Sequence, residues 1–199
     1  RRPRAPPGLP APGEPVAVLP PLAGAEPDPL PGLLFLVVFR NVHDQVVRWV
    51  RKSADAGRPW VVACDEPGDA THSLITDQED PGHDDARING LWGCLLGGGA
   101  GNEWYFGYKH PHSDLTCQDW RSRDKFWDQA KSALDFFYEN DVPFWKMEPV
   151  LTKSGDWALA GDGCVVVFVR SGGTTVLDLP EAEFTVSQMF PKTGGSGSY

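Results

Sequence analysis

Proline is concentrated at the start of this chain. Eleven of its 19 prolines fall within residues 1–31. Proline fixes the backbone φ angle and lacks the N–H group that helices and sheets use, so this stretch cannot form a regular core. The sequence therefore predicts a disordered or polyproline-like segment over residues 1–32. The folded part of the protein has to come from the residues that follow.

Charge and composition exclude several classes of protein. The 199 residues include 18 Lys and Arg against 27 Asp and Glu, a net charge of −9. A nucleic-acid-binding surface must be basic to neutralise phosphates, so we expect no nucleic acid partner. No apolar run approaches the roughly 20 residues of a membrane-spanning helix, so we expect no membrane partner. The four cysteines match neither a disulfide framework nor the spacing of zinc ligands.

Tryptophan is the second excess, with eight residues that all lie from Trp49 onward. Indole faces stack on the C–H surfaces of sugars, and carboxylates perform the chemistry of glycoside hydrolysis. A tryptophan-rich, acidic chain is therefore typical of carbohydrate-active proteins. The alternative is that the tryptophans fill a hydrophobic core, and composition does not decide between the two.

The folded part begins with a pattern typical of α/β proteins. Apolar residues recur at helical spacing from Val42 to Val50, and Gly57 provides a stop signal. The apolar run Trp60–Cys64 lacks polar alternation, which indicates a strand buried on both faces. Asp65 and Glu66 follow it directly. A helix, a buried strand and acidic residues at its carboxyl end are the order found in α/β barrels and doubly wound sheets.

Two further helices and a strand-rich region follow. Helical spacing predicts a helix through residues 88–95 that ends at the glycines of 97–99, then an aromatic strand over 100–108. A long helix is predicted over about 119–140, with the apolar stripe Phe126, Trp127, Ala130, Leu134 and Phe137. Beyond it, Val-, Phe- and Thr-rich runs between glycine turns predict an antiparallel β module, with strands at 157–160, 164–170, 174–179 and 184–190. The Gly/Ser-rich tail is predicted to be flexible.

Several stretches of the sequence resemble one family of hydrolases. They are residues 57–66 (GRPWVVACDE), 85–93 (DARINGLWG), 98–108 (GGAGNEWYFGY) and 119–124 (DWRSRD). These stretches resemble the end of the catalytic barrel in the apiosidase-like group of TIM-barrel glycoside hydrolases. Residues 157–195 resemble the C-terminal β-sandwich of that group, which carries a collagen-binding label. The resemblance covers about residues 41–195.

This resemblance implies an α/β plus β fold. Residues 33–145 would be the last units of an incomplete (β/α)8 barrel, residues 146–195 a small antiparallel β-sandwich domain, and residues 196–199 a flexible tail. A full barrel takes about 250 residues, so segments 60–64 and 100–108 would be its seventh and eighth strands. The first residue is not Met and no secretory signal is recognisable, so we expect a fragment of a longer chain. Such a remnant would expose open strand edges, and we expect it to be poorly soluble or unstable alone.

The resemblance also implies a catalytic residue. Related retaining barrels commonly take their nucleophile from the seventh strand, which makes Glu66 the candidate nucleophile. Asp65 is the alternative, because adjacent strand residues point to opposite faces. Glycoside hydrolysis needs two carboxylates, and the partner acid would come from an earlier strand that this chain lacks. We therefore expect hydrolysis of O-glycosidic bonds in a parent protein that is extracellular or periplasmic, and inactivity of the chain alone, so its status as an enzyme stays open.

Candidate substrate-binding residues lie in the loop and the aromatic segment that follow. Trp104 is a candidate platform for a sugar ring, with Tyr105 or Tyr108 beside it and Glu103 before it. Packing in the core is the alternative for Trp104. His72 could donate to a sugar hydroxyl or be an ordinary loop histidine.

Other polar clusters favour structural roles. Charged residues that begin the long helix are interpreted as a structural network; they are Asp119, Arg121, Arg123 and Asp124. Two candidate cation sites lack a recognised ligand order, and we expect no metal or cofactor; they comprise His110, His112 and Asp114, and the acidic stretch of Asp77, Glu79, Asp80, Asp84 and Asp85. Two further interpretations stay open: a non-catalytic carbohydrate- or protein-binding β module, and a fragment without function.

Overall fold

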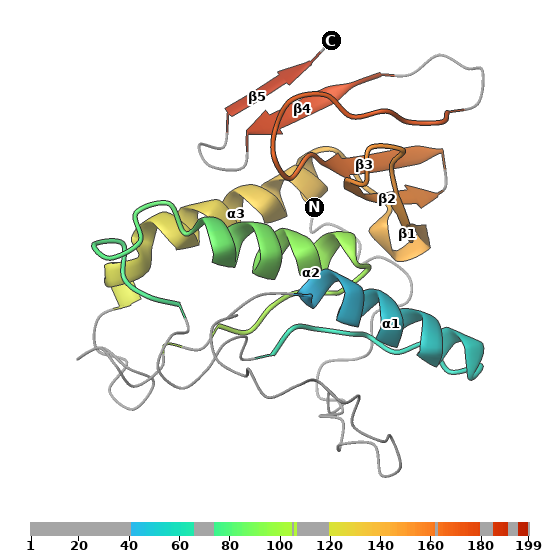
Figure 1. Cartoon of the computed structure of the whole chain (residues 1–199), viewed down its shortest axis with the longest axis horizontal. Coiled ribbons are helices and arrows are strands. Elements are labelled where there is room, and N and C mark those ends of the chain that lie inside the picture. The colour runs from blue at the N-terminus through green and yellow to red at the C-terminus, as the bar shows by residue number, and fades with distance from the viewer. Residues whose placement is uncertain are drawn as a thin grey trace, which may run out of the picture. The chain divides into compact units, whose positions relative to one another are not determined.

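The computed structural model describes residues 41–65, 74–104, 106, 120–161, 163–179, 185–190 and 195–198. All of them belong to the second of the two units into which the chain divides, Leu36–Tyr199. Helices occupy the first part of the described chain and strands the second (Figure 1). The predicted Pro-rich segment of residues 1–32 lies outside the described residues.

Helix α1 spans Val42–Asp55, and its buried residues include His43 and Val46. The helix ends where Gly57 adopts a φ of +72° and donates its N–H to the Ala54 carbonyl at 2.8 Å. Glycine adopts this left-handed conformation without a steric cost. The helix and its glycine stop signal are therefore confirmed.

A second helical stretch joins the π-helical η1 (Ala86–Trp92) to the α-helical α2 (Gly93–Leu96). Leu91 and Trp92 are buried in it, which confirms the helix predicted through residues 88–95. Gly97 follows directly, and a Cβ atom there would lie 3.0 Å from both the His43 carbonyl oxygen and Val46 Cβ. Glycine at this position therefore allows the end of α2 to approach α1 closely.

The third helical stretch consists of the short η2 (Trp120–Arg123) and α3 (Asp124–Glu139). Phe126 and Phe137 are buried as predicted, but Leu134 is 53% exposed. The prediction for Leu134 is wrong because the helical stripe that joins Phe126 to Phe137 passes through Ala133, which is fully buried.

Three antiparallel strands follow the turn η3 (Phe144–Lys146). Strands β1 (Glu148–Leu151), β2 (Trp157–Gly161) and β3 (Cys164–Phe168) lie in the order β1-β2-β3. Trp157 pairs with Phe168 and Leu159 with Val166, so these four side chains share one face of the sheet. The runs predicted at 157–160 and 164–170 are confirmed as β2 and β3, although β3 ends at Phe168.

Predictions for the rest of the strand region are met only in part. Strand β4 (Ser187–Phe190) covers the end of the run predicted at 184–190, and residues 174–179 form no strand. Strand β5 (Gly195–Ser198) pairs antiparallel with β4, and the flexibility of the tail stays a prediction. Backbone hydrogen bonding needs no apolar side chain, which explains why a Gly/Ser sequence gives no strand signal.

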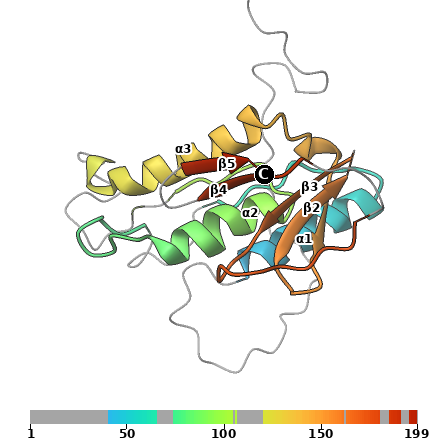
Figure 2. The ribbon, with the colours of Figure 1, turned by 90° about the horizontal axis from the view of Figure 1, so that it is seen from above.

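The helices and the three-stranded sheet share one hydrophobic core. Leu91, Trp92 and Phe137 from the helices pack with Trp157 and Phe168 from the sheet. Figure 2 shows that β2 and β3 lie on one side of the helices. The core therefore continues across residue 145, where the two parts of the chain were predicted to meet. The described residues neither complete nor exclude the predicted barrel and sandwich, which stay predictions.

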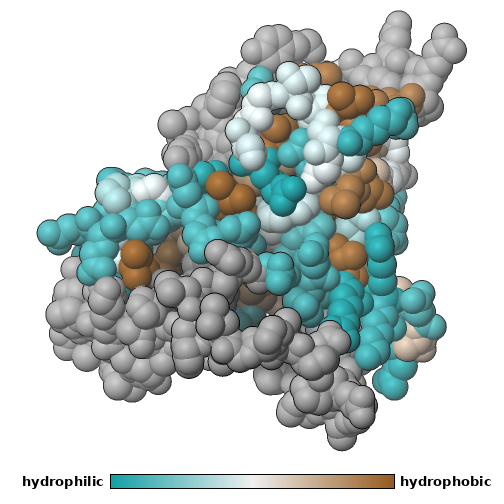
Figure 3. Space-filling view, in the orientation of Figure 1, coloured by the Kyte–Doolittle hydropathy of each residue, from teal (hydrophilic) through white to brown (hydrophobic). Residues whose placement is uncertain are grey.

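Some apolar side chains stay at the surface of the strand region. Figure 3 shows them on the face over the strands, and the exposed residues of this region include Leu151, Val165, Val176 and Val186. Among the described residues, no helix has both the length and the apolar character needed to cross a bilayer.

Candidate functional site

Two extended segments, residues 60–65 and 100–104, run side by side in the same direction. The Cys64 N–H donates to the Gly101 carbonyl at 3.0 Å, and the Glu103 N–H donates to the Cys64 carbonyl at 2.9 Å. A further hydrogen bond of 2.7 Å joins the Ala100 N–H to the Val62 carbonyl. Cys64 and Asn102 thus form a parallel bridge. The segments are arranged like neighbouring parallel strands, but only one bridge forms.

The prediction that Trp60–Cys64 is buried on both faces is wrong. Trp60 is 41% exposed and Val61 is 74% exposed. Burial of a face depends on the segments that cover it, and only Val62 and Cys64 are half-buried, whereas Ala63 is exposed as well. The apolar run Trp60–Cys64 therefore predicted an extended backbone correctly, but it did not predict whether the side chains are buried.

Helix packing fixes the position of the second segment. The Cys94 thiol of α2 donates to the Gly101 carbonyl at 3.1 Å. The side-chain amide of Asn102 donates to the Gly90 carbonyl of η1 at 3.3 Å. Both bonds join residues 101 and 102 to the helical stretch η1–α2, which directly precedes them in the chain. This stretch therefore holds residues 100–104 beside residues 60–65.

The carboxyl ends of the paired segments place acidic residues next to each other. Because Cys64 pairs with Asn102, the next residues along the two segments, Asp65 and Glu103, occupy neighbouring positions. Paired strands lie about 4.8 Å apart, and paired positions point to the same side. Both residues are exposed. We call Asp65 and Glu103 the carboxyl edge; Glu66, the candidate nucleophile, follows directly in the sequence and lies outside the described residues.

Trp104, the candidate sugar platform, makes contacts typical of a packed residue. Its ring centroid lies 4.5 Å from that of Phe126, with the ring planes at 76°. It is half-buried and packs against both hydrophobic clusters of the protein. The packing alternative therefore accounts for its contacts, and a role in sugar binding stays a prediction. Tyr105, Tyr108 and His72 lie outside the described residues.

Two thiols behind the carboxyl edge are held in their protonated form. Burial, together with the nearby Cys94 and Asp65, raises the pKa of Cys64 to about 12. Burial also raises the pKa of Cys94 to about 11. The thiolate is the reactive species, so these cysteines are inert at neutral pH. They are free thiols, as the sequence indicates; Cys117 lies outside the described residues.

This protonation leads to a prediction about alkylation. At pH 8, iodoacetamide is expected to modify Cys64 about 10³-fold and Cys94 about 10²-fold more slowly in the folded chain than in urea, because the fraction of thiolate falls about tenfold for each unit by which the pKa is raised. Peptide mass spectrometry measures the rate at each site. Cys164 in β3, which is partly exposed, serves as the internal reference. Equal rates in the folded and unfolded chains would contradict the prediction.

The acidic stretch after residue 74 forms an internal network of hydrogen bonds. His83 is buried, and its Nε2 lies 2.7 Å from Asp77 Oδ1. The other oxygen of Asp77 accepts the Lys125 N–H at 3.1 Å, in the first turn of α3. Asp80 accepts the His83 N–H at 3.0 Å. The His83–Asp77 pair was not predicted from the sequence. The only feature that could have drawn attention to His83 is the Pro-Gly-His sequence at 81–83, which is typical of a turn.

The other acidic residues of this stretch bind side chains of the same region. Asp84 accepts from the Arg87 guanidinium at 2.6 Å, and Asp85 accepts from the Asn89 amide at 2.5 Å. Among the described residues, no group of three or more His, Cys, Asp or Glu residues is arranged to hold a metal ion. The other candidate group, His110, His112 and Asp114, lies outside them.

Arg123, from the charged cluster that begins the long helix, is completely buried. Its Nε donates to the Leu74 carbonyl at 3.0 Å, and its Nη1 donates to Ser122 Oγ at 2.6 Å. The guanidinium lies 4.3 Å from the centroid of the Phe106 ring. The contacts of Arg123 are all with other parts of the protein, in agreement with the structural network predicted for this cluster.

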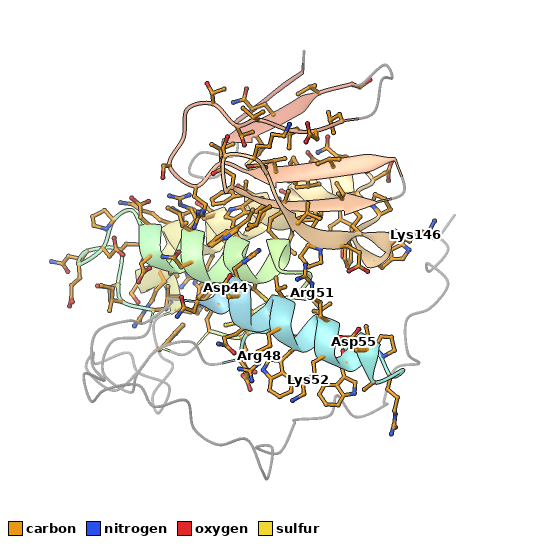
Figure 4. The ribbon with its side chains drawn as sticks, turned by 45° about the vertical axis from the view of Figure 1, so that its right-hand side comes forward. Asp44, Arg48, Arg51, Lys52, Asp55 and Lys146 are labelled. Atoms are coloured by element: carbon orange, nitrogen blue, oxygen red, sulfur yellow. The ribbon has the colours of Figure 1, made fainter. Side chains whose placement is uncertain are left out.

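Helix α1 carries an exposed surface of both charges (Figure 4). Arg48 and Lys52 point away from the strands, whereas Arg51 turns toward β1 and donates to the Pro149 carbonyl at 3.1 Å. With Asp44 and Asp55 on the same helix, this surface has the composition of an ordinary solvated helix face.

Comparison with family models, with curated proteins and with solved structures gave no match. The resemblance to apiosidase-like hydrolases therefore stays a prediction that depends on the sequence stretches quoted for it. The geometry of the carboxyl edge provides an independent basis for a functional proposal.

Proposed function

We propose that this chain takes part in the hydrolysis of O-glycosidic bonds, and that the carboxyl edge faces the sugar. The observation that supports this proposal is the parallel pairing of Cys64 with Asn102. It brings Asp65 and Glu103 together at the ends of two segments, where α/β proteins usually bind their ligands. An extracellular or periplasmic location belongs to the same proposal.

The chemistry requires two carboxyl groups with different roles. One acts as general acid on the leaving oxygen, and the other acts as nucleophile or as general base. Glu66 is the candidate nucleophile and Asp65 its alternative. Glu103 provides a further carboxylate on the neighbouring segment. In glycosidases, two adjacent carboxyl groups take different roles because the negative charge of one raises the pKa of the other.

The test is hydrolysis of a panel of aryl glycosides and oligosaccharides by a longer parent protein that contains this chain and supplies the partner acid, and by variants of that protein. Glu66→Gln is expected to lower the rate by about 10²–10⁴-fold, because the amide is neither a nucleophile nor a base. Asp65→Asn and Glu103→Gln identify the second carboxylate. Glu139→Gln, at the exposed end of α3, is the matched control and should leave the rate unchanged.

The outcomes separate hydrolysis from its alternatives. Turnover that Glu66→Gln or Asp65→Asn removes, with an unchanged melting temperature, supports the proposal. Turnover that survives both substitutions contradicts it. Binding of oligosaccharides without turnover supports the second candidate function instead.

That second candidate is a carbohydrate-binding module without catalysis. The observation that favours it is an exposed aromatic pair in η3, where Phe144 is 43% exposed and Trp145 is 60% exposed. A Cβ atom at Gly161 would lie 2.5 Å from the Lys146 carbonyl oxygen, so β2 packs closely against this turn. Rings held in this way can stack on sugar faces. Trp145→Ala should then abolish binding while Glu66→Gln leaves it intact.

A further inference from the structure

Two cysteines from different elements, Cys64 and Cys94, meet behind the carboxyl edge. The Cys64 N–H donates to the Gly101 carbonyl at 3.0 Å, and the Cys94 thiol donates to the same oxygen at 3.1 Å. The backbone of Cys64 also forms a hydrogen bond with the Cys94 sulfur. The main chain of one cysteine therefore lies directly beside the side chain of the other.

The Cys64 side chain points to the side on which Cys94 lies. Side chains of an extended segment alternate between two faces. Residues 61, 63 and 65 are exposed, whereas residues 62 and 64 are half-buried, so Cys64 faces the protein. Cys94 of α2 is completely buried. After burial, the charge of Cys94 is the largest influence that raises the pKa of Cys64, which requires the two sulfurs to be near each other.

Each sulfur also has a polar neighbour that favours its thiolate. Burial raises the pKa of both cysteines, but a hydrogen bond with the Asn102 side chain opposes this rise at Cys64, and hydrogen bonds with the backbones of Cys64 and Gly101 oppose it at Cys94. Asn102 is itself fixed in place, because its amide donates to the Gly90 carbonyl of η1 at 3.3 Å. Since the thiolate is the form that binds metals, these groups prepare the pair for a cation.

The number and type of the ligands decide which cation fits. Structural Zn²⁺ sites take four ligands, and among the described residues no third His, Cys, Asp or Glu joins the two thiols in a metal-binding group. Thiolates are soft ligands that select Cu(I), and two of them in a linear arrangement satisfy this ion. We propose that Cys64 and Cys94 together bind one Cu(I) ion.

Binding exchanges two protons for the cation. Two Cu–S bonds form, each thiol loses its proton to water, and the product is a bis-thiolate complex with one negative charge; no electron is transferred. A coordinating thiol is deprotonated by the metal itself, so thiols that react slowly with iodoacetamide still bind Cu(I). Half-buried Cys64 provides the entry to the site, and Cys94 closes its inner end.

Anaerobic titration of the whole chain tests the proposal, with ascorbate as the reductant and bicinchoninate as a coloured competitor for Cu(I). We expect uptake of one Cu(I) per chain and release of two protons, which a pH indicator in weak buffer measures. Cys64→Ser should weaken binding by more than about 10²-fold, because losing a ligand costs more than losing an outer-shell partner. An excess of Zn²⁺ should not displace the bound Cu(I).

The other two cysteines provide the matched controls. Cys164→Ser and Cys117→Ser should each leave the affinity unchanged. Cu(I) should also raise the melting temperature of the unsubstituted chain but not that of Cys64→Ser, whose fold without metal is verified by circular dichroism. Cys94→Ala tests the buried ligand in the same way where that variant folds, and Cys64→Ser decides the outcome where it does not.

Several results would overturn this assignment. They are the absence of Cu(I) uptake by the whole chain, uptake without proton release, uptake that survives Cys64→Ser, displacement by Zn²⁺, and an equal loss of affinity in Cys117→Ser or Cys164→Ser. The last result would place the site at a different pair of thiols.

Discussion

Replacement of Trp92 by alanine is expected to lower the free energy of unfolding by about 3–5 kcal/mol, the usual cost of deleting a buried tryptophan. Trp92 is 3% exposed. Its ring stacks on Phe168 of β3 at a centroid distance of 5.0 Å, and it contacts Phe136 and Phe137 of α3. The substitution therefore leaves a cavity where η1, α3 and the sheet meet.

Two further variants make this prediction specific. The indole nitrogen of Trp92 is buried and has no hydrogen-bond partner in the described part of the chain, so Trp92→Phe keeps most of the packing and should cost about 1 kcal/mol. Trp145→Ala removes an indole that is 60% exposed and should change stability by less than about 0.5 kcal/mol. Urea denaturation followed by circular dichroism measures all three. Similar losses for Trp92→Ala and Trp145→Ala would contradict a core shared by helices and sheet.

The helices could be predicted because their signals are local. The apolar stripe of α1 and the glycines after Leu96 report on residues only a few positions apart in the chain. Leu134 shows the limit of this reasoning. In α3, an apolar stripe through Leu134 and one through Ala133 both fit the sequence pattern. Only the contacts of the helix with the rest of the protein decide that the stripe through Ala133 is buried.

The strands were harder to predict because pairing is not local. The apolar run Trp60–Cys64 indicates an extended backbone, but its burial depends on which segments cover it. Strand β5 has only Gly and Ser, and its pairing with β4 depends on backbone bonds that side-chain patterns do not report. The same limitation explains why β1, which contains Glu148 and Pro149, gave no signal.

The candidate site was predicted in part. The position of Asp65 after an extended segment follows from the sequence, whereas the parallel direction of residues 100–104 was expected only from the resemblance to a barrel. The neighbouring positions of Asp65 and Glu103 depend on the register of Cys64 with Asn102, which the sequence does not encode in any local pattern. The His83–Asp77 pair was missed for a similar reason, because its role depends on the start of α3, which lies more than forty residues further along the chain.

Replacement of Arg123 by alanine is the second substitution with a large expected effect, also about 3–5 kcal/mol. Arg123 is completely buried, and hydrogen bonds that involve a charged group are worth about 1.5–3 kcal/mol each. The substitution leaves the Leu74 carbonyl, which is 3.0 Å from Nε, without this donor. It also removes the guanidinium stacked over Phe106. Arg123→Lys should be nearly as damaging, since an ammonium has neither the planar surface nor the fork of donors.

The control for Arg123 is its exposed neighbour in the same turn. Arg121 stacks over Trp120 at 4.8 Å, so Arg121→Ala removes a similar cation and aromatic contact at the surface and should cost less than about 1 kcal/mol. Urea denaturation again gives the comparison. A loss for Arg123→Ala no larger than that for Arg121→Ala would mean that the buried guanidinium does not hold residue 74, Phe106 and the start of α3 together. Phe106 and Trp104 pack against the same cluster, so a much larger loss for Arg123→Ala is the result expected if this cation holds that cluster together.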